Sequence, residues 1–326
     1  MATDLYLGLD IGGTKMAVGI ADAQGRLAAD AAEPTDPAWR PGDVVEALHR
    51  MSQGVCGEAG VEMQDLRAVG ISYGGPVDYA AGVTVTCHHL EGWENVPLVR
   101  LVEERFGLPA AMDNDANAAA LAEAVFGAGK GHTHLLYLTV SSGIGGGIII
   151  DGEIYRGATS MAGEIGHTTV KPDGPVCTCG RRGCLEALAS GWSIARRATE
   201  KAREWPGESA LKGEGEITAQ AVARAAEGGD ALALEIMRET ADYLAFGIGA
   251  GVNLLNPTLV VLGGGVSQAG VVLFDPLREA LGKYALKENA AAVEVAPAAL
   301  GAQVGVLGGV ALALSVGAGR CGPGGE

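Results

Sequence analysis

Basic side chains are scarce in this chain and nowhere form a run. Lys and Arg number 23 against 39 Asp and Glu, which gives a formal net charge of −16. Proteins that bind nucleic acid need clustered Lys and Arg to neutralise phosphates. The composition therefore argues against a nucleic-acid partner, and the acidic surface mainly keeps the protein soluble.

The chain also lacks any apolar stretch of the uncharged length that a membrane span requires. Its first residues, Met1–Tyr6, show neither the basic start nor the apolar run of a signal peptide. We therefore expect a cytoplasmic protein. Cysteines stay reduced in that compartment, which favours a thiolate metal site over a disulfide framework.

Aromatic residues are few, at 5% of the chain, whereas 48% of the residues are hydrophobic. This balance fits a soluble α/β protein. With 326 residues the chain is long enough for two domains that each have a proper core.

Cysteine is also scarce, yet three of the six cysteines lie within eight residues. Cys177, Cys179 and Cys184 follow His167, and three thiols with one imidazole are a ligand set of closed structural zinc sites. The spacing differs from the paired Cys-x-x-Cys knuckles of zinc fingers. The alternative is three unrelated cysteines in a glycine-rich loop, but their clustering beside a histidine favours a metal site.

Two strand–turn–strand patterns occur, one early in each half of the chain. Leu5–Ile20 is interrupted by Asp10–Lys15, and Leu135–Ile150 by Ser141–Gly143. Such turns expose backbone N–H groups to an anion, although a single Gly-Gly turn is more often only a hairpin. With Gly263–Gly265 as a third loop, the pattern predicts a duplicated fold that holds a nucleotide between two lobes.

A third feature is the strand-to-helix junction at Asp113–Asp115. The expected strand Pro109–Met112 leads into an alanine-rich helix, Ala116–Phe126. Asn and Asp are preferred at helix N-caps, which explains one of the three polar residues. The surplus makes Asp115 a candidate general base.

The rest of the chain is read as helices joined by loops. Val69–Ser72 is an expected strand that leads into the glycine-rich loop Gly74–Asp78, and Pro206–Glu216 is an expected exposed loop. The expected helices are Pro41–Glu58, Pro97–Phe106, Ser193–Glu204, Ile217–Glu227, Asp230–Leu255 and Val304–Val316.

The motifs together resemble those of the ROK family of sugar kinases and sugar-responsive repressors, over essentially the whole chain. The motifs that carry this resemblance are Asp10-Ile-Gly-Gly-Thr14, Gly74-Gly-Pro-Val-Asp78, Asn114-Asp-Ala-Asn117, Ser142-Gly-Ile-Gly-Gly-Gly147, Gly163-Glu-Ile-Gly-His167, Cys177-x-Cys-Gly-x-x-Gly-Cys184-Leu-Glu186 and Leu262-Gly-Gly-Gly-Val266.

The resemblance implies an α/β protein with the two-lobed actin-like ATPase fold, a duplicated ribonuclease H-like fold with the nucleotide and sugar in the cleft. We expect an N-terminal domain, 1–112, joined by the C-terminal helix 304–316. A larger domain, 113–303, carries the zinc loop 163–186, and 317–326 is a frayed tail.

The resemblance also implies roles for individual residues. Asp115 is the catalytic base, and Asp10 holds Mg²⁺ through water. The sugar is bound by Gly75, Asn114, Asp115, Glu164, His167 and Glu186. A structural Zn²⁺ is bound by His167, Cys177, Cys179 and Cys184. The residues that hold ATP, the co-substrate, are Asp10, Gly12, Gly13, Thr14, Lys15, Ser142, Gly143, Gly145, Gly263, Gly264 and Gly265.

The expected activity is transfer of the γ-phosphoryl group of ATP to the 6-hydroxyl of a hexose, with glucose as the leading substrate. N-acetylmannosamine, N-acetylglucosamine, fructose and allose are alternatives, and inorganic polyphosphate is an alternative donor. Members of the family commonly form homodimers. A non-catalytic sugar-binding module or ATPase is a further alternative, which Asp115 and Glu164 argue against.

Two features depart from the family pattern. The second phosphate loop reads Ser141-Ser142-Gly143 where relatives often have Gly-Thr-Gly, and the hydroxyl of Ser142 is expected to preserve its function. His88 and His89 lie where many relatives have an asparagine-containing segment. Two interpretations stay open: the histidines alter the rim of the sugar pocket, or they are only exposed loop residues. Repressors of the family carry an N-terminal helix-turn-helix domain, for which the stretch before Asp10 leaves no room.

Overall fold

The computed structural model describes residues 4–86, 92–213 and 215–317. These residues form two compact units. Unit 1 contains the described residues up to Gly131, the segment Glu153–Ala162 and the residues from Ala299 to Gly317. Unit 2 contains His132–Gly152 and Gly163–Ala298.

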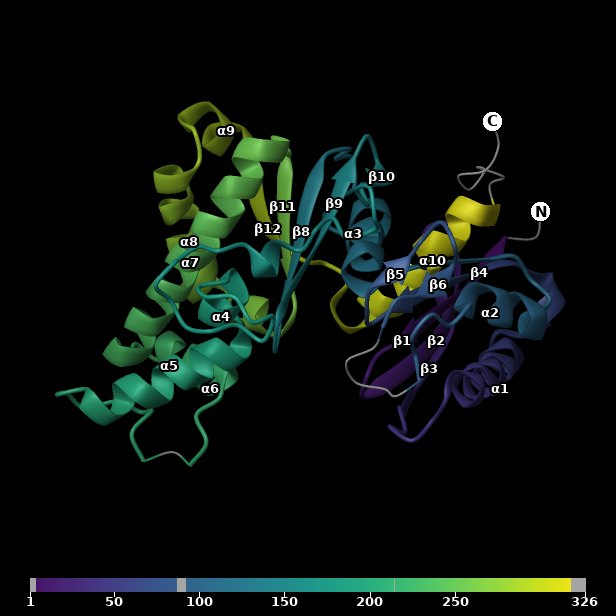
Figure 1. Ribbon diagram of the computed structural model, residues 1–326, viewed down its shortest axis with the longest axis horizontal. Coiled ribbons are helices and arrows are strands. Elements are labelled where there is room, and N and C mark those ends of the chain that lie inside the picture. The colour runs from purple at the N-terminus through teal and green to yellow at the C-terminus, as the bar shows by residue number, and fades with distance from the viewer. Residues whose placement is uncertain (1–3, 87–91, 214, 318–326) are drawn as a thin grey trace. The chain divides into compact units, whose positions relative to one another are not determined.

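Unit 1 is built on a five-stranded sheet with the strand order β3-β2-β1-β4-β7 (Figure 1). Its strands are β1 Leu5–Ile11, β2 Lys15–Asp22, β3 Leu27–Pro34, β4 Leu66–Tyr73 and β7 Ala110–Asn114. β1 and β2 form the predicted antiparallel hairpin, and β4 and β7 continue the sheet parallel to β1. A separate ribbon pairs β5 Val77–Asp78 with β6 Val83–Thr84.

Helices cover both faces of this sheet. They are α1 Pro41–Ala59, α2 Leu98–Phe106, α3 Asp115–Phe126 and α10 Val304–Gly317. Because side chains alternate along a strand, Leu7 and Leu9 join the core under α1 and α2, whereas Tyr6 joins the core of α3 and α10. Pro41 at the first turn of α1 and Gly60 at its left-handed C-cap fix the helix ends close to where the sequence predicts them.

α10 approaches the sheet more closely than side chains would allow. A methyl group on Gly70 of β4 would overlap the carbonyl oxygen of Gly309, and one on Gly8 of β1 would overlap the carbonyl oxygen of Val306. Glycine on both the helix and the strands therefore lets backbone pack against backbone.

Gly70→Ala is expected to lower the free energy of unfolding by about 1–3 kcal/mol, because the backbone of α10 cannot move away without opening the core. Gly54→Ala is the matched control: Gly54 lies inside α1 with open space around it, and alanine there should raise the stability by about 0.4–1 kcal/mol. Urea unfolding of both variants measures the difference. Equal stability of the two proteins would contradict the close packing of α10.

Unit 2 repeats the sheet arrangement of unit 1, because its strand order β9-β8-β11-β12 corresponds to β2-β1-β4-β7. Its strands are β8 Leu135–Val140, β9 Ile144–Ile150, β11 Leu259–Gly263 and β12 Glu294–Pro297, and the short strand β10 Glu153–Ile154 belongs to the segment Glu153–Ala162 of unit 1. β8 and β9 form an antiparallel hairpin, and β11 and β12 follow parallel to β8. The predicted duplication is thus confirmed, since a hairpin followed by two parallel strands occurs in both units. After β9 the chain turns at Asp151 and Gly152, both of which have positive φ.

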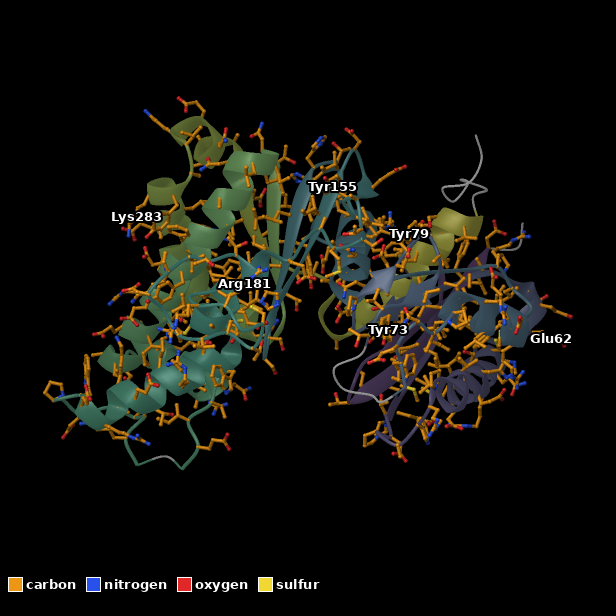
Figure 2. All side chains as sticks on the ribbon, in the orientation of Figure 1. Glu62, Tyr73, Tyr79, Tyr155, Arg181 and Lys283 are labelled. Atoms are coloured by element: carbon orange, nitrogen blue, oxygen red, sulfur yellow. The ribbon has the colours of Figure 1, made fainter. Side chains whose placement is uncertain are left out.

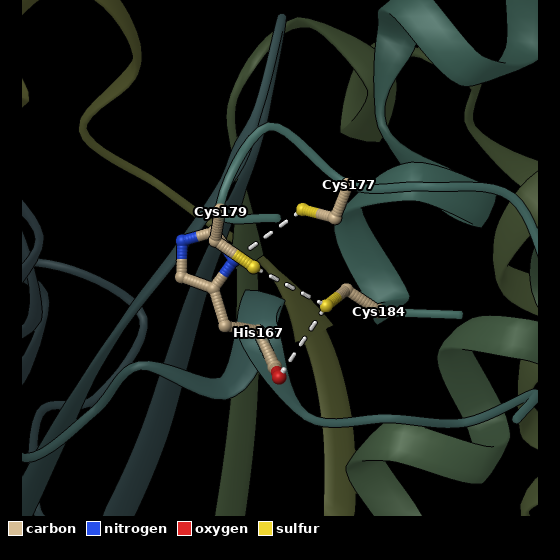
Figure 3. Close-up of side chains that lie close together, drawn as sticks. All are labelled: His167, Cys177, Cys179 and Cys184. Carbon is tan, nitrogen blue, oxygen red and sulfur yellow. Dashed lines mark hydrogen bonds between the residues drawn. The ribbon is translucent and has the colours of Figure 1, made fainter. Parts of the chain in front are cut away.

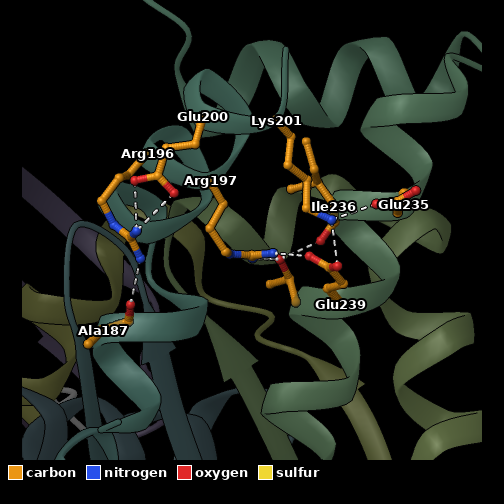
Figure 4. A network of polar contacts seen from close by, with 9 residues as sticks. Ala187, Arg196, Arg197, Glu200, Lys201, Glu235, Ile236 and Glu239 are labelled. Carbon is orange, nitrogen blue, oxygen red and sulfur yellow. Dashed lines mark hydrogen bonds and ion pairs between the residues drawn. The ribbon is translucent and has the colours of Figure 1, made fainter. Parts of the chain in front are cut away.

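The helices of unit 2 are α4 Leu185–Ala189, α5 Gly191–Glu204, α6 Ala219–Glu227, α7 Ala231–Leu255, α8 Val271–Tyr284 and α9 Lys287–Ala292. Ion pairs join α5 to α7 (Figure 4): Glu239 accepts from Arg197 at 2.9 Å and from Lys201 at 2.6 Å. Across the described ranges of both units, no helix combines the length and apolarity needed to cross a membrane.

Several elements escaped the sequence prediction. β3 pairs with β2 although its residues alternate between exposed and half-exposed, and α8 contains Pro276, which reads as a helix breaker. The contacts place α3 in unit 1, whereas the expected domain boundary falls after Met112. The helix packs there because Phe126 and Ala122 share a core with α10.

Candidate functional site

Three polar side chains lie side by side near the carboxyl ends of the parallel strands of unit 1. Asp10 of β1 is paired with Ser72 of β4, and Ser72 with Asp113 of β7. The Ser72 hydroxyl donates to Asp10 Oδ1 at 3.0 Å. Burial raises the pKa of the Asp10 carboxyl, and the hydrogen bond from Ser72 and the charge of Lys15 lower it in part.

The first glycine-rich turn follows Asp10 directly. The Gly12 N–H donates to the carbonyl of Lys15 at 3.0 Å, and the Gly12 carbonyl accepts from the Thr35 hydroxyl at 2.9 Å. Thr14 is exposed, and Gly13 is partly so. The turn is therefore held by its neighbours while its tip stays open, as an anion-binding turn requires.

Gly74 connects this turn to the predicted base. Its N–H donates to the carbonyl of Ile11 at 2.9 Å. The position of a Cβ at Gly74 would lie 3.6 Å from Gly12 Cα and 3.9 Å from Asp115 Oδ2. The structure thus brings both Asp115 and the first turn close to one small residue, within unit 1.

The junction at Asn114 and Asp115 begins α3 as expected from capping. Asn114 is the N-cap, its Oδ1 accepts from the Ala116 N–H at 2.9 Å, and its Nδ2 donates to the Gly75 carbonyl at 3.2 Å. Asp115 is the first helical residue, is exposed, and accepts from the Ala116 N–H through Oδ1 at 2.8 Å. The N-cap is therefore Asn114, so the need for a cap does not by itself explain the carboxylate at Asp115.

Asp113 belongs to a buried network that sequence reasoning missed. Its side chain is 1% exposed and pairs with Arg156, Nε to Oδ2, at 2.6 Å. Its Oδ1 accepts from the Asn114 N–H at 2.8 Å and from Asn117 Nδ2 at 2.9 Å. Only the surplus of acids at this junction signals the site, because nothing in the sequence marks Arg156 as the partner.

In unit 2, the Gly163–His167 motif lies against β9. A side chain on Gly163 would crowd the Gly146 carbonyl, and one on Gly166 would overlap the carbonyl of Ile144. Gly163 also has a φ of 94°, which favours glycine. Glu164 is left exposed at the start of a single 3₁₀ turn that ends with His167.

The predicted metal ligands gather at one point (Figure 3). The ligand atoms of His167, Cys177, Cys179 and Cys184 all lie within 4.8 Å of one another. His167 Nδ1 is 3.6 Å from Cys177 Sγ, and Cys179 Sγ is 3.6 Å from Cys184 Sγ. Tetrahedral zinc with Zn–S bonds near 2.3 Å separates two thiolates by about 3.8 Å. The donor set and its spacing therefore fit zinc.

The three thiols differ in their surroundings. Burial raises the pKa of the Cys184 thiol to about 12, and its neighbours Cys179 and Cys177 add to this effect. A backbone hydrogen bond from Arg181 lowers the pKa of the exposed Cys179. Thiols bind zinc only as thiolates, so a metal here would displace protons, most of all from Cys184.

Glu186 connects the zinc loop to the second hairpin turn. Its Oε1 accepts from the Thr178 hydroxyl at 3.2 Å and lies 3.6 Å from Cys177 Sγ. Its Oε2 accepts from the Ile144 N–H at 3.0 Å. The carboxylate thus holds the loop of the metal ligands beside the start of β9.

The second turn meets a helix start and the third glycine loop. The carbonyl of Ser141 accepts from the Gly191 N–H, the first residue of α5, at 2.7 Å. Gly264 has a φ of 82°, and a side chain there would overlap the backbone of Val140. Ser142 is exposed and Gly143 partly so.

Some predicted residues lie elsewhere or cannot be placed. Gly145 lies within β9, opposite Thr139, not in the turn itself, and Gly265 begins the 3₁₀ turn Gly265–Ala269 after β11. His88 and His89 lie outside the described residues, as does the tail beyond Gly317.

Comparison with known proteins agrees with this arrangement. The ROK family model matches residues 6–316. The chain is 38% identical to a glucokinase of Halalkalibacterium halodurans, over 95% of this chain and 94% of the relative. It is 35% identical to a putative xylose repressor of Caldicellulosiruptor sp., over 83% of this chain and 68% of that protein.

A solved structure gives the same picture. A ROK family glucokinase from Streptomyces griseus, in complex with glucose and AMPPNP, superimposes with a TM-score of 0.78 at 34% identity, covering 95% of this chain and 99% of the other. The duplicated sheets thus have the two-lobed actin-like ATPase fold of sugar kinases. Within that fold, the chain belongs to the ROK family.

Proposed function

We propose that this protein is an ATP-dependent sugar kinase that phosphorylates the 6-hydroxyl of a hexose, glucose above all. The observation that carries the proposal is the position of Asp115, which lies 3.9 Å from the Cβ position of Gly74, beside the first glycine-rich turn. A carboxylate that is not needed as a cap therefore stands next to a phosphate-type turn. The glucokinase relatives support glucose as the acceptor.

In the proposed reaction Asp115 accepts the proton of the sugar hydroxyl as the hydroxyl oxygen attacks the γ-phosphorus of ATP. The bond from that phosphorus to the β,γ-bridging oxygen breaks, and ADP leaves. Phosphoryl transfer mainly requires positioning and charge stabilisation. Backbone N–H groups and hydroxyls of the two hairpin turns, at Gly12–Thr14 and Ser141–Gly143, would supply contacts to the phosphates.

Asp10 is the residue that would hold Mg²⁺. Asp10 lies near the carboxyl end of β1, directly before the first turn. Burial disfavours the charged form of its carboxyl group, so a nearby cation would stabilise that form. Mg²⁺ keeps several waters and takes few carboxylate ligands, which fits a single aspartate. The ion would neutralise charge on the phosphates.

We assign sugar recognition to the residues that the resemblance to the ROK family implies, which are Gly75, Asn114, Asp115, Glu164, His167 and Glu186. Carboxylates, an amide and an imidazole can satisfy a ring of hydroxyls by accepting and donating in fixed geometry. If zinc is bound at Nδ1 of His167, the nitrogen that faces the thiols, the other nitrogen Nε2 carries the proton and can donate to the sugar.

The proposal is tested by the release of ADP from purified, zinc-replete protein with ATP and a panel of sugars: glucose, mannose, fructose, allose, N-acetylglucosamine and N-acetylmannosamine. We expect sugar-dependent ADP with the highest kcat/KM for glucose, and NMR of the product should show phosphate on O6. Replacing ATP by polyphosphate tests the donor. If no sugar on the panel stimulated ADP release, the proposal would be wrong.

A second candidate function is that of a sugar-responsive repressor, because a putative xylose repressor is among the relatives. A gel-shift with DNA from upstream of the protein's own coding sequence separates the two. Binding that glucose releases would favour a repressor. We expect none, because basic residues are few and do not cluster in the sequence. A homodimer and a cytoplasmic location remain predictions from the sequence.

A further inference from the structure

The ion pair between Asp113 and Arg156 has features of a positioning device for the proposed base. Asp113 comes immediately before the N-cap of α3, and its side chain is 1% exposed. Arg156 comes from the segment Glu153–Ala162, which is distant in sequence but belongs to the same unit. A buried carboxylate with a single close guanidinium partner is held in a defined place.

The guanidinium of Arg156 is itself fixed on two further sides. Its central carbon lies 3.6 Å from the centre of the Tyr79 ring (labelled in Figure 2), and its Nη1 donates to the Ile154 carbonyl at 3.4 Å. The loop that carries it is closed by the Ala162 N–H, which donates to the Arg156 carbonyl at 3.0 Å. Tyr79 is anchored to the same loop, because its N–H donates to the Ser160 hydroxyl at 3.3 Å.

The other carboxylate oxygen of Asp113 accepts hydrogen bonds from residues at the start of α3. Oδ1 accepts from the Asn114 N–H at 2.8 Å and from Asn117 Nδ2 at 2.9 Å. These two donors flank Asp115 along the chain, one residue before it and two after it. The position of Asp113 thus determines where the first turn of α3 begins, and with it the backbone that carries Asp115.

We propose that Arg156 is a positioning residue for phosphoryl transfer: through Asp113 it fixes the first turn of α3 and so aims the carboxylate of Asp115. The inference rests on the proposed role of Asp115. It differs from a purely structural role, because a displacement of about 1 Å at a reacting group can cost about 100-fold in rate without unfolding the protein.

The test compares Arg156→Met, Arg156→Lys and the double variant Arg156→Met/Asp113→Asn. We expect Arg156→Met to lower kcat about 100-fold while the KM for ATP stays within about twofold. Arg156→Lys should lie between, because lysine keeps the charge but not the planar group that pairs with Asp113 and stacks on Tyr79.

The double variant separates positioning from charge neutralisation. Arg156→Met alone leaves a buried carboxylate unpaired, and Asp113→Asn removes that charge. The double variant should therefore regain thermal stability yet keep the low kcat. If its kcat returned with its stability, Arg156 would only neutralise Asp113, and the proposal would be overturned.

The matched control is Arg26→Met. Arg26 pairs with a largely buried aspartate, Asp22, in the same unit, also Nε to Oδ2 at 2.6 Å, but in the turn between β2 and β3. The kcat of the Arg26→Met variant should equal that of the wild type. A loss as large as that of Arg156→Met would mean that any broken ion pair in unit 1 impairs the enzyme, which contradicts a specific role.

Hydrogen exchange gives a readout that does not depend on kinase activity. The amides of residues 114–118 should exchange at least about 10-fold faster in Arg156→Met than in the wild type, while those of α1 stay unchanged, because only the first turn of α3 loses its anchor. Unchanged exchange there would refute the proposal even if the wild type proved inactive on every sugar. Inactivity of the wild type alone would refute only the proposed function.

Discussion

Asp115→Asn is expected to lower kcat about 10²–10⁴-fold, the contribution that a positioned general base typically makes. Asparagine has the shape of aspartate and can still accept from the Ala116 N–H, which Asp115 Oδ1 does at 2.8 Å. It cannot take a proton from the sugar hydroxyl. Initial rates at saturating ATP and glucose measure the loss.

Binding and fold should survive this substitution. Asp115 is exposed, and the N-cap of α3 is Asn114, so the helix keeps its capping hydrogen bond from the Ala116 N–H at 2.9 Å. Calorimetry should therefore find glucose binding within a few-fold of the wild type, since one hydrogen bond contributes about 1 kcal/mol. Near-normal turnover would exclude Asp115 as the base.

A second acidic residue in a first helical turn supplies the control. Asp43 lies in the first turn of α1, in the same unit, and its Oδ2 accepts from the Arg40 N–H at 3.0 Å. Asp43→Asn changes the same functional group without touching the proposed site, so its kcat should match the wild type. A similar loss in both variants would indicate a general effect of removing acids from helix starts.

Local sequence signals were sufficient to predict helix ends and the metal-ligand cluster, because each of these features requires a particular residue type. Pro41 and Gly60 mark the ends of α1, and Asn114 caps α3 as its side chain predicts. Likewise, three cysteines and His167, predicted as a ligand set from composition and spacing, have ligand atoms within 4.8 Å. Spacing succeeds here because the thiols lie within one short loop, so few conformations separate them.

Sequence signals failed where a partner comes from a distant segment. Asp113 accepts a hydrogen bond from Nε of Arg156 at 2.6 Å, and the two residues are 43 positions apart in the sequence. No sequence pattern around Arg156 distinguishes it from an exposed arginine. Glu123 is a second case: its buried carboxylate accepts from the backbone N–H groups of Ala299 and Leu300, which only the fold brings near it. Neither partner can be read from periodicity, because both depend on the packing of whole elements.

If the Cys/His cluster binds zinc, Cys179→Ser is expected to release the metal and to raise the KM for glucose at least about 10-fold, because the ion would order the loop that also carries Glu186. Cys179 is the exposed ligand, so the substitution leaves the buried Cys177 and Cys184 in place and limits damage to the core. His167 would lose the metal that fixes its ring, and Glu186 would lose the ordered partners Thr178 and Cys177. The KM for ATP should change little.

Cys56→Ser is the matched control for this loss. Cys56 is a buried free thiol in the core of unit 1, and it is not part of the Cys/His cluster. Its replacement should cost stability but leave both the zinc content, measured by atomic emission, and the KM for glucose unchanged. If Cys179→Ser lost its zinc and kept a normal KM for glucose, the metal would not support sugar binding. In that case the cluster would act only on the stability of its own loop.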